Sequence, residues 1–280
     1  MPKNMTMKRF SFIYISLCLV LVLLVGLPTQ AQTKRYDEYD PIADFYNSFW
    51  SKPLERLAMG KLNRLLVPKL KPKAKILDLM CGTGHIAAAL HAQGYQMTGL
   101  DGSAKMLEFA KQNVPSMELW LKDARTFETR QKFDAVICMS DGLNHIMQLK
   151  GLTQAFTQVY KALKKGGRFV FDMNWEQRYI KGWNIRGARF EFKNSEGIFT
   201  SSYNRNTRQG TLKFWLYSPM DGSKKTWKRT QWELTQHCYT PAQIKQALEK
   251  AGFKKITVYE AAQDLDDQRN AGRAYYVCQK

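Results

Sequence analysis

The stretch ILDLMCGTGHIAAAL (residues 76–90) constrains the fold of this chain more than any other segment. A short apolar run leads into a turn that contains two glycines, and an alanine-rich segment follows the turn. The apolar run indicates a buried strand, and the alanines favour a helix. A strand, a glycine turn and a helix in this order are typical of a β–α–β unit, in which the turn commonly holds a ligand.

The same alternation of strand and helix patterns continues along the chain, which predicts a parallel sheet in an α/β fold. A later helix begins at Thr240 and closes at Gly252, and two last strands follow it. The predicted strands are Lys75–Met80, Tyr95–Leu100, Met117–Leu121, Phe133–Met139, Gly167–Met173, Lys255–Tyr259 and Arg273–Cys278. The predicted helices of the alternating region are His85–Gln93, Ser103–Asn113 and Leu149–Lys164.

The pattern changes after Asn174. Residues 185–238 contain alternating segments rich in aromatic and β-branched residues, separated by turn sequences such as NSEG and MDGSK. We therefore predict a small antiparallel sheet inserted into a domain that spans residues 34–280. Trp215, Trp227 and Trp232 are expected to share one half-buried face of this sheet, with basic residues on its solvated face.

The first 33 residues resemble a targeting segment. Basic residues precede an uncharged apolar run at residues 10–27, and small residues follow at Thr29 and Ala31. This pattern is typical of a signal peptide, although about 18 apolar residues are also the lower limit for a membrane span. A signal peptide and an uncleaved membrane anchor both stay open. Either one predicts a protein that is exported or membrane-associated, with membrane contact through residues 10–27 if they are not cleaved.

Lys and Arg outnumber Asp and Glu by 43 to 24, which gives a formal net charge of +19. This charge attracts anionic partners, but the positive residues are spread along the chain, so we favour a solvated basic surface. The five cysteines lack the spacing of a metal site, and no metal is predicted. A Cys238–Cys278 disulfide stays open for an exported protein.

The residues around the glycine turn limit what it can bind. A P-loop requires a lysine after its last glycine, but His85 follows Gly84, which excludes this motif. A dinucleotide fingerprint matches at Gly82, Gly84 and Ala87, so an NAD-dependent oxidoreductase is an alternative. Against it, the carboxylate of Asp78 would repel a pyrophosphate at the helix N-terminus.

Three acidic residues near the ends of successive predicted strands suit a cationic nucleoside without phosphate. Asp78 suits an ammonium group, and Asp101 suits a ribose diol because a carboxylate accepts both hydroxyl protons. Asp123 can accept a hydrogen bond from an adenine amino group. S-adenosylmethionine carries all three groups, and we predict it as the cofactor.

The segments ILDLMCGTG, MTGLDGSAKML, LKDARTF, FDAVICMSDGLNHI and LKKGGRFVFDMN occur in the order and spacing of class I S-adenosylmethionine-dependent methyltransferases. The resemblance covers roughly residues 36–280, although Met80 replaces the family's first motif glycine. It implies a Rossmann-like sheet of seven mostly parallel strands in the order 3-2-1-4-5-7-6. The inserted sheet and the N-terminal YDEYDPIADFY look like the small-molecule subgroup, which includes sugar N-methyltransferases and glycine N-methyltransferase.

The resemblance also implies a set of cofactor-binding residues. They come from the glycine turn, from the ends of the strands that follow it, and from N-terminal tyrosines that cover the cofactor. For Tyr36, a further candidate, the core face of a helix is the favoured interpretation, and for Tyr46 the same interpretation stays an alternative. The predicted set is Asp78, Met80, Cys81, Gly82, Gly84, Asp101, Gly102, Met106, Asp123, Ala124, Met139, Ser140, Tyr39 and Tyr46.

His145 is the predicted catalytic residue. It stands where the resembling sugar and glycine methyltransferases carry a histidine, which is a proposed general base in the sugar enzymes. An ordinary histidine pKa of ~6.5 suits proton removal near neutral pH. A histidine that caps the next helix, or that lines the pocket without transferring a proton, is the alternative.

The resemblance predicts methyl transfer to N or O of a small-molecule acceptor. The [DN]PP[YF] motif of nucleic-acid amino-methyltransferases is absent, which disfavours a nucleic-acid partner, although an RNA methyltransferase stays an alternative. A second alternative is a membrane-tethered binding module without catalysis. It arises because the cofactor is made in the cytosol while the N-terminus predicts export, and for the same reason a cytoplasmic location stays open.

Overall fold

The computed structural model describes residues 38–220 and 226–280. The predicted signal peptide or anchor at residues 1–33 and the candidate Tyr36 lie outside this part of the chain. Within the described residues, no helix combines the length and the apolar character that a membrane span requires.

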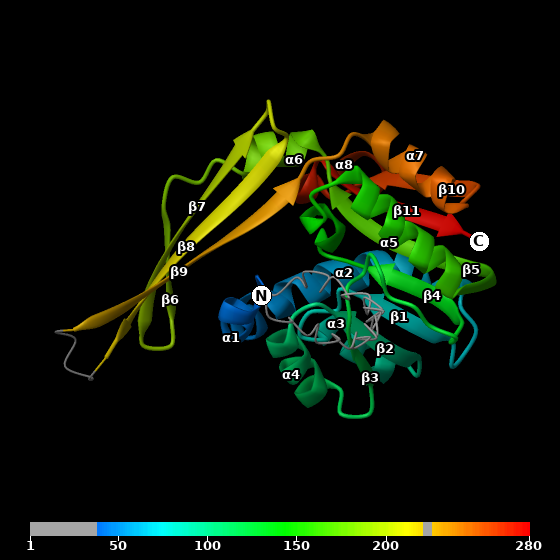
Figure 1. Ribbon diagram of the computed structural model, residues 1–280, viewed down its shortest axis with the longest axis horizontal. Coiled ribbons are helices and arrows are strands. Elements are labelled where there is room, and N and C mark those ends of the chain that lie inside the picture. Colours follow the sequence, from blue (N-terminus) through cyan, green and yellow to red (C-terminus); the bar gives the residue numbers. More distant parts are fainter. Residues whose placement is uncertain (1–37, 221–225) are drawn as a thin grey trace, which may run out of the picture. The chain divides into compact units, whose positions relative to one another are not determined.

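A seven-stranded sheet forms the centre of the domain (Figure 1). Its order, β10-β11-β5-β4-β1-β2-β3, confirms the predicted order, because β11 and β10 are the seventh and sixth strands of this sheet along the chain. β11 runs antiparallel to both of its neighbours, and the pairs from β5 to β3 are parallel. The strands are β1 (Lys75–Leu79), β2 (Gln96–Asp101), β3 (Glu118–Leu121), β4 (Phe133–Cys138), β5 (Leu163–Asn174), β10 (Lys255–Glu260) and β11 (Arg273–Gln279).

Helices cover both faces of this sheet and bury a separate core on each. One core lies under α5 (Leu149–Ala162) and α7 (Pro241–Ala251), where the Phe156 and Phe171 rings are 5.3 Å apart. The other lies under α2 (Ser51–Leu65), α3 (His85–Ala92), α4 (Ala104–Asn113) and α8 (Ala261–Asp264). Burial on two sides thus explains why strands such as β1 and β4 are nearly continuous apolar runs.

Local sequence signals account for most element boundaries. Helix α7 starts at the N-cap Thr240 and ends at Gly252, as predicted. The structure adds a capping box between Thr240 and Gln243 and a φ of 112° at Gly252. Helix α8 was not predicted from its polar sequence. It forms because the Glu260 carboxylate accepts hydrogen bonds from the backbone N–H groups of Ala262 and Gln263. Helix α6 (Glu176–Gly182) was also missed.

The predicted insertion is a four-stranded antiparallel sheet in the order β6-β7-β8-β9. Its strands are β6 (Ala188–Phe192), β7 (Ser195–Asn204), β8 (Gln209–Pro219) and β9 (Trp227–His237). The expectation that the three tryptophans share a face is wrong. Trp232 pairs with Phe214, whereas Trp215 and Trp227 have the opposite parity along their strands and therefore point to the other face.

The free thiols of Cys238 and Cys278 show that these two cysteines form no disulfide. Both thiols are buried, one after β9 and the other in β11. Strands β9 and β11 belong to different sheets. The disulfide that the sequence left open is therefore not part of this fold.

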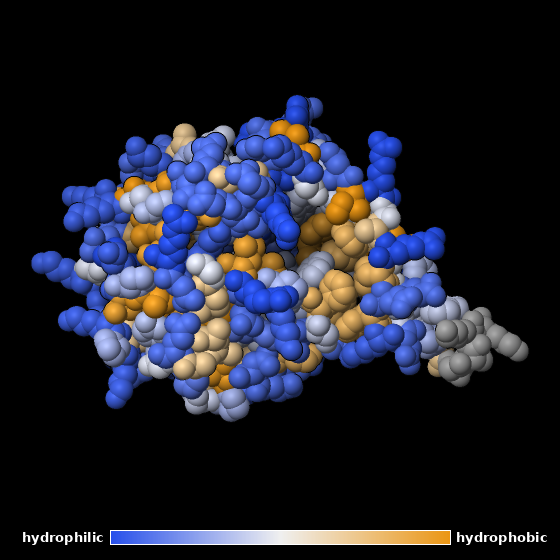
Figure 2. Space-filling view, turned by 180° about the vertical axis from the view of Figure 1, so that it is seen from behind, coloured by the Kyte–Doolittle hydropathy of each residue, from blue (hydrophilic) through white to orange (hydrophobic). Residues whose placement is uncertain are grey.

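The N-terminal segment joins the inserted sheet to the main domain. It consists of η1 (Asp40–Ile42), α1 (Ala43–Phe45) and the π-helical turn η2 (Tyr46–Trp50), which runs directly into α2. The Phe45 ring lies 4.8 Å from the ring of Phe190, and the Asp40 carboxylate accepts hydrogen bonds from Ser103 and from the N–H of Lys105. Figure 2 shows the apolar side chains gathered on the inserted sheet beside a hollow in the surface.

The backbone at Gly84 has a left-handed conformation that favours glycine. We therefore expect Gly84→Ala to lower the free energy of unfolding by about 1–3 kcal/mol. Gly84 has φ +77°, and an added Cβ would lie 3.0 Å from the Cβ of Ala110 in α4. Gly60→Ala in α2 is the matched control. There the added Cβ meets nothing within 4 Å, and the variant should gain up to about 1 kcal/mol in urea unfolding. Equal shifts in the two variants would contradict this role of Gly84.

Candidate active site

The turn after β1 bends back toward the end of β2. Met80 and Gly82 have φ values of 60° and 55°, in the left-handed region. The N–H of Gly82 donates to Asp101 Oδ2 at 2.8 Å, and the N–H of Ser103 donates to Asp101 Oδ1 at 2.9 Å. Met80 therefore bends the backbone in the left-handed way that glycine adopts freely, at a cost of about 1–2 kcal/mol for a residue with a Cβ.

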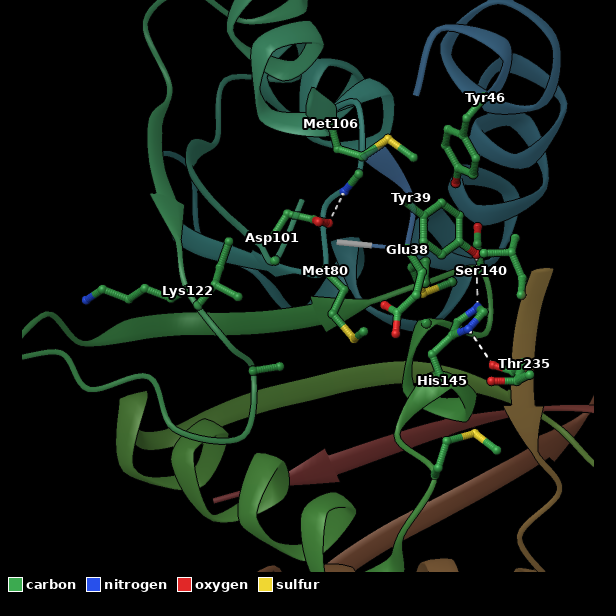
Figure 3. Close-up of a pocket in the computed structure, with 18 residues that line it drawn as sticks. Glu38, Tyr39, Tyr46, Met80, Asp101, Met106, Lys122, Ser140, His145 and Thr235 are labelled. Atoms are coloured by element: carbon green, nitrogen blue, oxygen red, sulfur yellow. Dashed lines mark hydrogen bonds between the residues drawn. The ribbon is translucent and has the colours of Figure 1, made fainter. Parts of the chain in front are cut away.

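A pocket opens where β1, β2 and β4 end (Figure 3). Most of the predicted cofactor residues line it, together with the predicted base. These are Tyr39, Tyr46, Met80, Gly82, Asp101, Gly102, Met106, Ala124, Met139, Ser140 and His145. The other lining residues were not predicted from the sequence, and they are Glu38, Leu100, Lys122, Gly142, Met147, Leu234 and Thr235.

Four predicted cofactor residues do not line the pocket. Asp78 lies inside β1, and only 2% of its surface is exposed. The Asp123 carboxylate is bonded to the guanidinium and the backbone N–H of Arg125. Gly84 forms the start of α3, and the Cys81 sulfur packs against Gly99. Ligand contact by these four residues stays a prediction.

The pocket is acidic although the chain as a whole is basic. Burial, and then the charge of Asp101, raises the pKa of Asp78 to about 8. Burial also raises the pKa of Asp101 to about 6, against the effect of the N–H groups that it accepts. Asp78 Oδ2 has no hydrogen-bond partner among the described residues. The carboxylates of Glu38 and Asp101, which line the pocket, fit a cationic ligand such as S-adenosylmethionine, whereas Asp78 keeps its proton below about pH 8 and adds no charge there.

His145 lies at the opposite end of the pocket from Lys122 (Figure 3). Its Nδ1 donates to the carbonyl oxygen of Thr235 at 2.8 Å, because a carbonyl can only accept. Nε2 therefore carries the lone pair, and it accepts from the Tyr39 hydroxyl at 2.9 Å. Burial lowers the pKa of His145, while the charge of Asp141 opposes this effect. The imidazole is thus neutral at pH 7 and can accept a proton.

His145 does not cap the following helix, as one alternative proposed. Helix α5 has Gln148 at its N-cap and no side-chain cap. His145 instead ends η4 (Gly142–His145), the short helical turn that lies between β4 and α5. This position directs its ring toward Tyr39 and the inserted sheet.

Buried ion pairs hold the segment that carries Ser140 and His145. The Arg273 guanidinium binds Asp141 at 2.6 Å and also pairs with Asp172. Ser140 and Asp141 both have left-handed φ values, 63° and 52°, which non-glycine residues adopt only when their surroundings impose them. This network was not predicted from the sequence. Its signal was a charged residue inside the apolar strand segment VFDMN and another at the start of the segment RAYYV.

Known proteins resemble this chain over the pocket and beyond it. Residues 76–167 match a family model described as Methyltransferase domain. The chain is 25% identical to glycine N-methyltransferase of Oryctolagus cuniculus over 73% of this chain and 77% of that protein. It is 26% identical to dTDP-4-amino-2,3,4,6-tetradeoxy-D-glucose N,N-dimethyltransferase of Saccharopolyspora spinosa, over 54% of this chain and 59% of that protein.

A solved structure has the same fold. It is an amino pentose methyltransferase from Micromonospora echinaspora with S-adenosylmethionine bound. The TM-score is 0.63 at 20% sequence identity, and the match covers 85% of this chain and 94% of that one.

We expect Asp78→Asn to change how stability depends on pH. With a pKa of about 8 against an ordinary 3.8, the folded state keeps a proton that the unfolded chain loses above pH 4. The free energy of unfolding therefore falls as the pH rises from about 4 to about 8, and the variant should lose less stability over that window. Urea unfolding at several pH values measures this. For Asp266→Asn, a control at an exposed position, the curve of unfolding free energy against pH should run parallel to that of the wild type. A parallel curve for Asp78→Asn as well would refute the raised pKa of Asp78.

Proposed function

Because the chain belongs to the class I S-adenosylmethionine-dependent methyltransferases, we propose that it methylates an amine nitrogen of a sugar-like small molecule. The observation that carries this proposal is the hydrogen-bonded pair of Tyr39 and His145 inside an acidic pocket. An amine arrives as an ammonium near neutral pH and must lose a proton before it can attack a methyl group. A neutral imidazole meets that requirement.

The charges along the pocket support an amine without a carboxylate. Glu38 lines the same pocket as Tyr39 and His145, and a carboxylate there attracts an ammonium. Lys122 is the one lysine or arginine among the described lining residues. Its ammonium donates to the Glu128 carbonyl at 3.2 Å and lies 5.0 Å from the Trp120 ring centroid, away from His145. An acceptor that resembles glycine would therefore find no cation for its carboxylate, whereas an amino sugar needs none.

S-adenosylmethionine, when bound, supplies a methyl group on a positively charged sulfur. In this chain, we expect Asp101 to hold ribose hydroxyls, and the Tyr46 ring lies over Gly82, where it can shield the pocket from water. Tyr39 donates its hydroxyl proton to His145 Nε2 while it accepts one from the acceptor ammonium. Burial raises the pKa of Tyr39, so the hydroxyl relays the proton rather than staying ionised. The freed nitrogen lone pair is then available for in-line displacement.

The alternatives from the sequence have less support. An RNA acceptor would bring phosphates toward a pocket whose wall carries Glu38 and Asp101. A binding module without catalysis would not need a neutral histidine, His145, hydrogen-bonded to the hydroxyl of Tyr39. Residues 1–33 support a separate proposal from their sequence pattern alone, namely that they target or anchor a domain formed by residues 34–280. A C-terminal reporter that is active on only one side of the membrane tests this.

The proposed acceptor class predicts a preference that can be measured with matched amines. Purified protein is incubated with S-adenosylmethionine and either amino sugars or amino acids, and methylated products are identified by mass spectrometry. We expect amino sugars to be methylated at nitrogen, with kcat/KM at least about tenfold above that for glycine, which corresponds to about 1.4 kcal/mol. A preference for glycine, or methylation only at oxygen, would contradict the proposal.

His145→Ala should lower kcat by about 10²- to 10⁴-fold with the best amine of that panel, because proton removal is lost. Affinity for S-adenosylmethionine, measured by calorimetry, should stay within about threefold, since His145 lies at the acceptor end of the pocket. His91→Ala, on the exposed side of α3, is the control and should change neither value. An unchanged kcat in the His145 variant would remove the histidine from the mechanism.

A further inference from the structure

Gln236 brings the inserted sheet into contact with the active site. It lies in β9, and only 2% of its surface is exposed. Its amide nitrogen donates to Asp141 Oδ2 at 2.5 Å, and its amide oxygen accepts from the Tyr179 hydroxyl at 2.8 Å. The oxygen also lies 3.4 Å from the Asn174 amide nitrogen. These partners fix which end of the amide is nitrogen, because an ionised carboxylate can only accept.

The fixed amide nitrogen also lies 3.2 Å from Nε2 of His145. Tyr39 approaches the same ring nitrogen, and the carbonyl of Thr235 holds Nδ1 in its protonated form. A tyrosine hydroxyl can turn and accept a hydrogen bond, but an amide nitrogen cannot. If Nε2 were protonated, its N–H would face the N–H of Gln236, and neither group could accept.

We propose that Gln236 is a positioning residue that keeps Nε2 of His145 an unprotonated acceptor, ready to take the proton of the methyl acceptor. Its role rests on the proposed function of His145 as the base. The inserted sheet therefore does more than close the pocket: through Thr235 it fixes one ring nitrogen as a donor, and through Gln236 it fixes the other as an acceptor.

The charged groups around His145 do not by themselves keep its Nε2 unprotonated. Glu38 and Tyr39 face it from the N-terminal segment, and Asp141 faces it from the start of its own turn. The two carboxylates favour a protonated imidazole, although the Arg273 guanidinium binds Asp141 and also Asp172. Burial acts in the opposite direction and lowers the pKa of His145. A rigid donor at Nε2 adds to the effect of burial.

Long-range ¹H–¹⁵N correlation spectra of the full protein test the proposal without any acceptor. The chain has four histidines, and the spectrum of a His145→Gln variant assigns the signal. We expect wild-type His145 to be neutral at pH 7, with its proton on Nδ1. In Gln236→Glu, an oxygen replaces the donor, and the titration midpoint of His145 should rise by at least about one unit, a tenfold change in its proton affinity.

Gln231→Glu provides a matched control on the same strand. Gln231 is exposed and lies five residues before Gln236, about 17 Å along β9, so its new charge should leave the His145 midpoint unchanged. A wild-type proton on Nε2 would overturn the proposal even if Gln236→Glu failed to fold. An unshifted midpoint in a folded Gln236→Glu would overturn it as well. Absence of methyl transfer with a normal titration would count only against the proposed function.

Discussion

The pocket depends on one buried guanidinium, that of Arg273, which forms ion pairs with both Asp141 and Asp172. It ties the segment after β4 to two neighbouring strands, β5 and β11. This attachment offsets the left-handed backbone of Ser140 and Asp141, which costs of order 1–3 kcal/mol per residue. Removing the guanidinium would leave two buried carboxylates side by side, and breaking such pairs typically costs about 3–5 kcal/mol. Asp141 also accepts a hydrogen bond from Gln236 in the inserted sheet. Because Gln236 in turn contacts His145, the ion pairs also help to fix the surroundings of His145.

Much of the fold could be predicted because its signals are local. Strand and helix periods, the capping box at Thr240 and the turn glycines each depend on a few neighbouring residues, and the ordered motifs supplied the sheet order. The pocket could be predicted for the same reason, since parallel strands bring their carboxyl ends to one edge. Met80 occupies the position of a family glycine, and its φ of 60° shows that the turn keeps its shape without one.

The missed features depend on contacts between distant parts of the chain. Asp141, Gln236 and Arg273 meet from three separate segments, and no pattern in any one segment predicts that they do. Asp78 is a buried residue of β1, and its contact with the ligand stays a prediction. Trp215 and Trp232 point to opposite faces of the inserted sheet. Which face each one takes depends on the register between β8 and β9, which the sequence leaves unspecified.

A structure of the protein in complex with S-adenosylhomocysteine tests the central claim most directly. We predict that the ribose hydroxyls contact Asp101, that Tyr46 covers the ligand over the turn, and that the sulfur faces the end of the pocket that holds Tyr39 and His145. A ligand bound outside this pocket, or one whose sulfur points toward Lys122, would contradict this assignment.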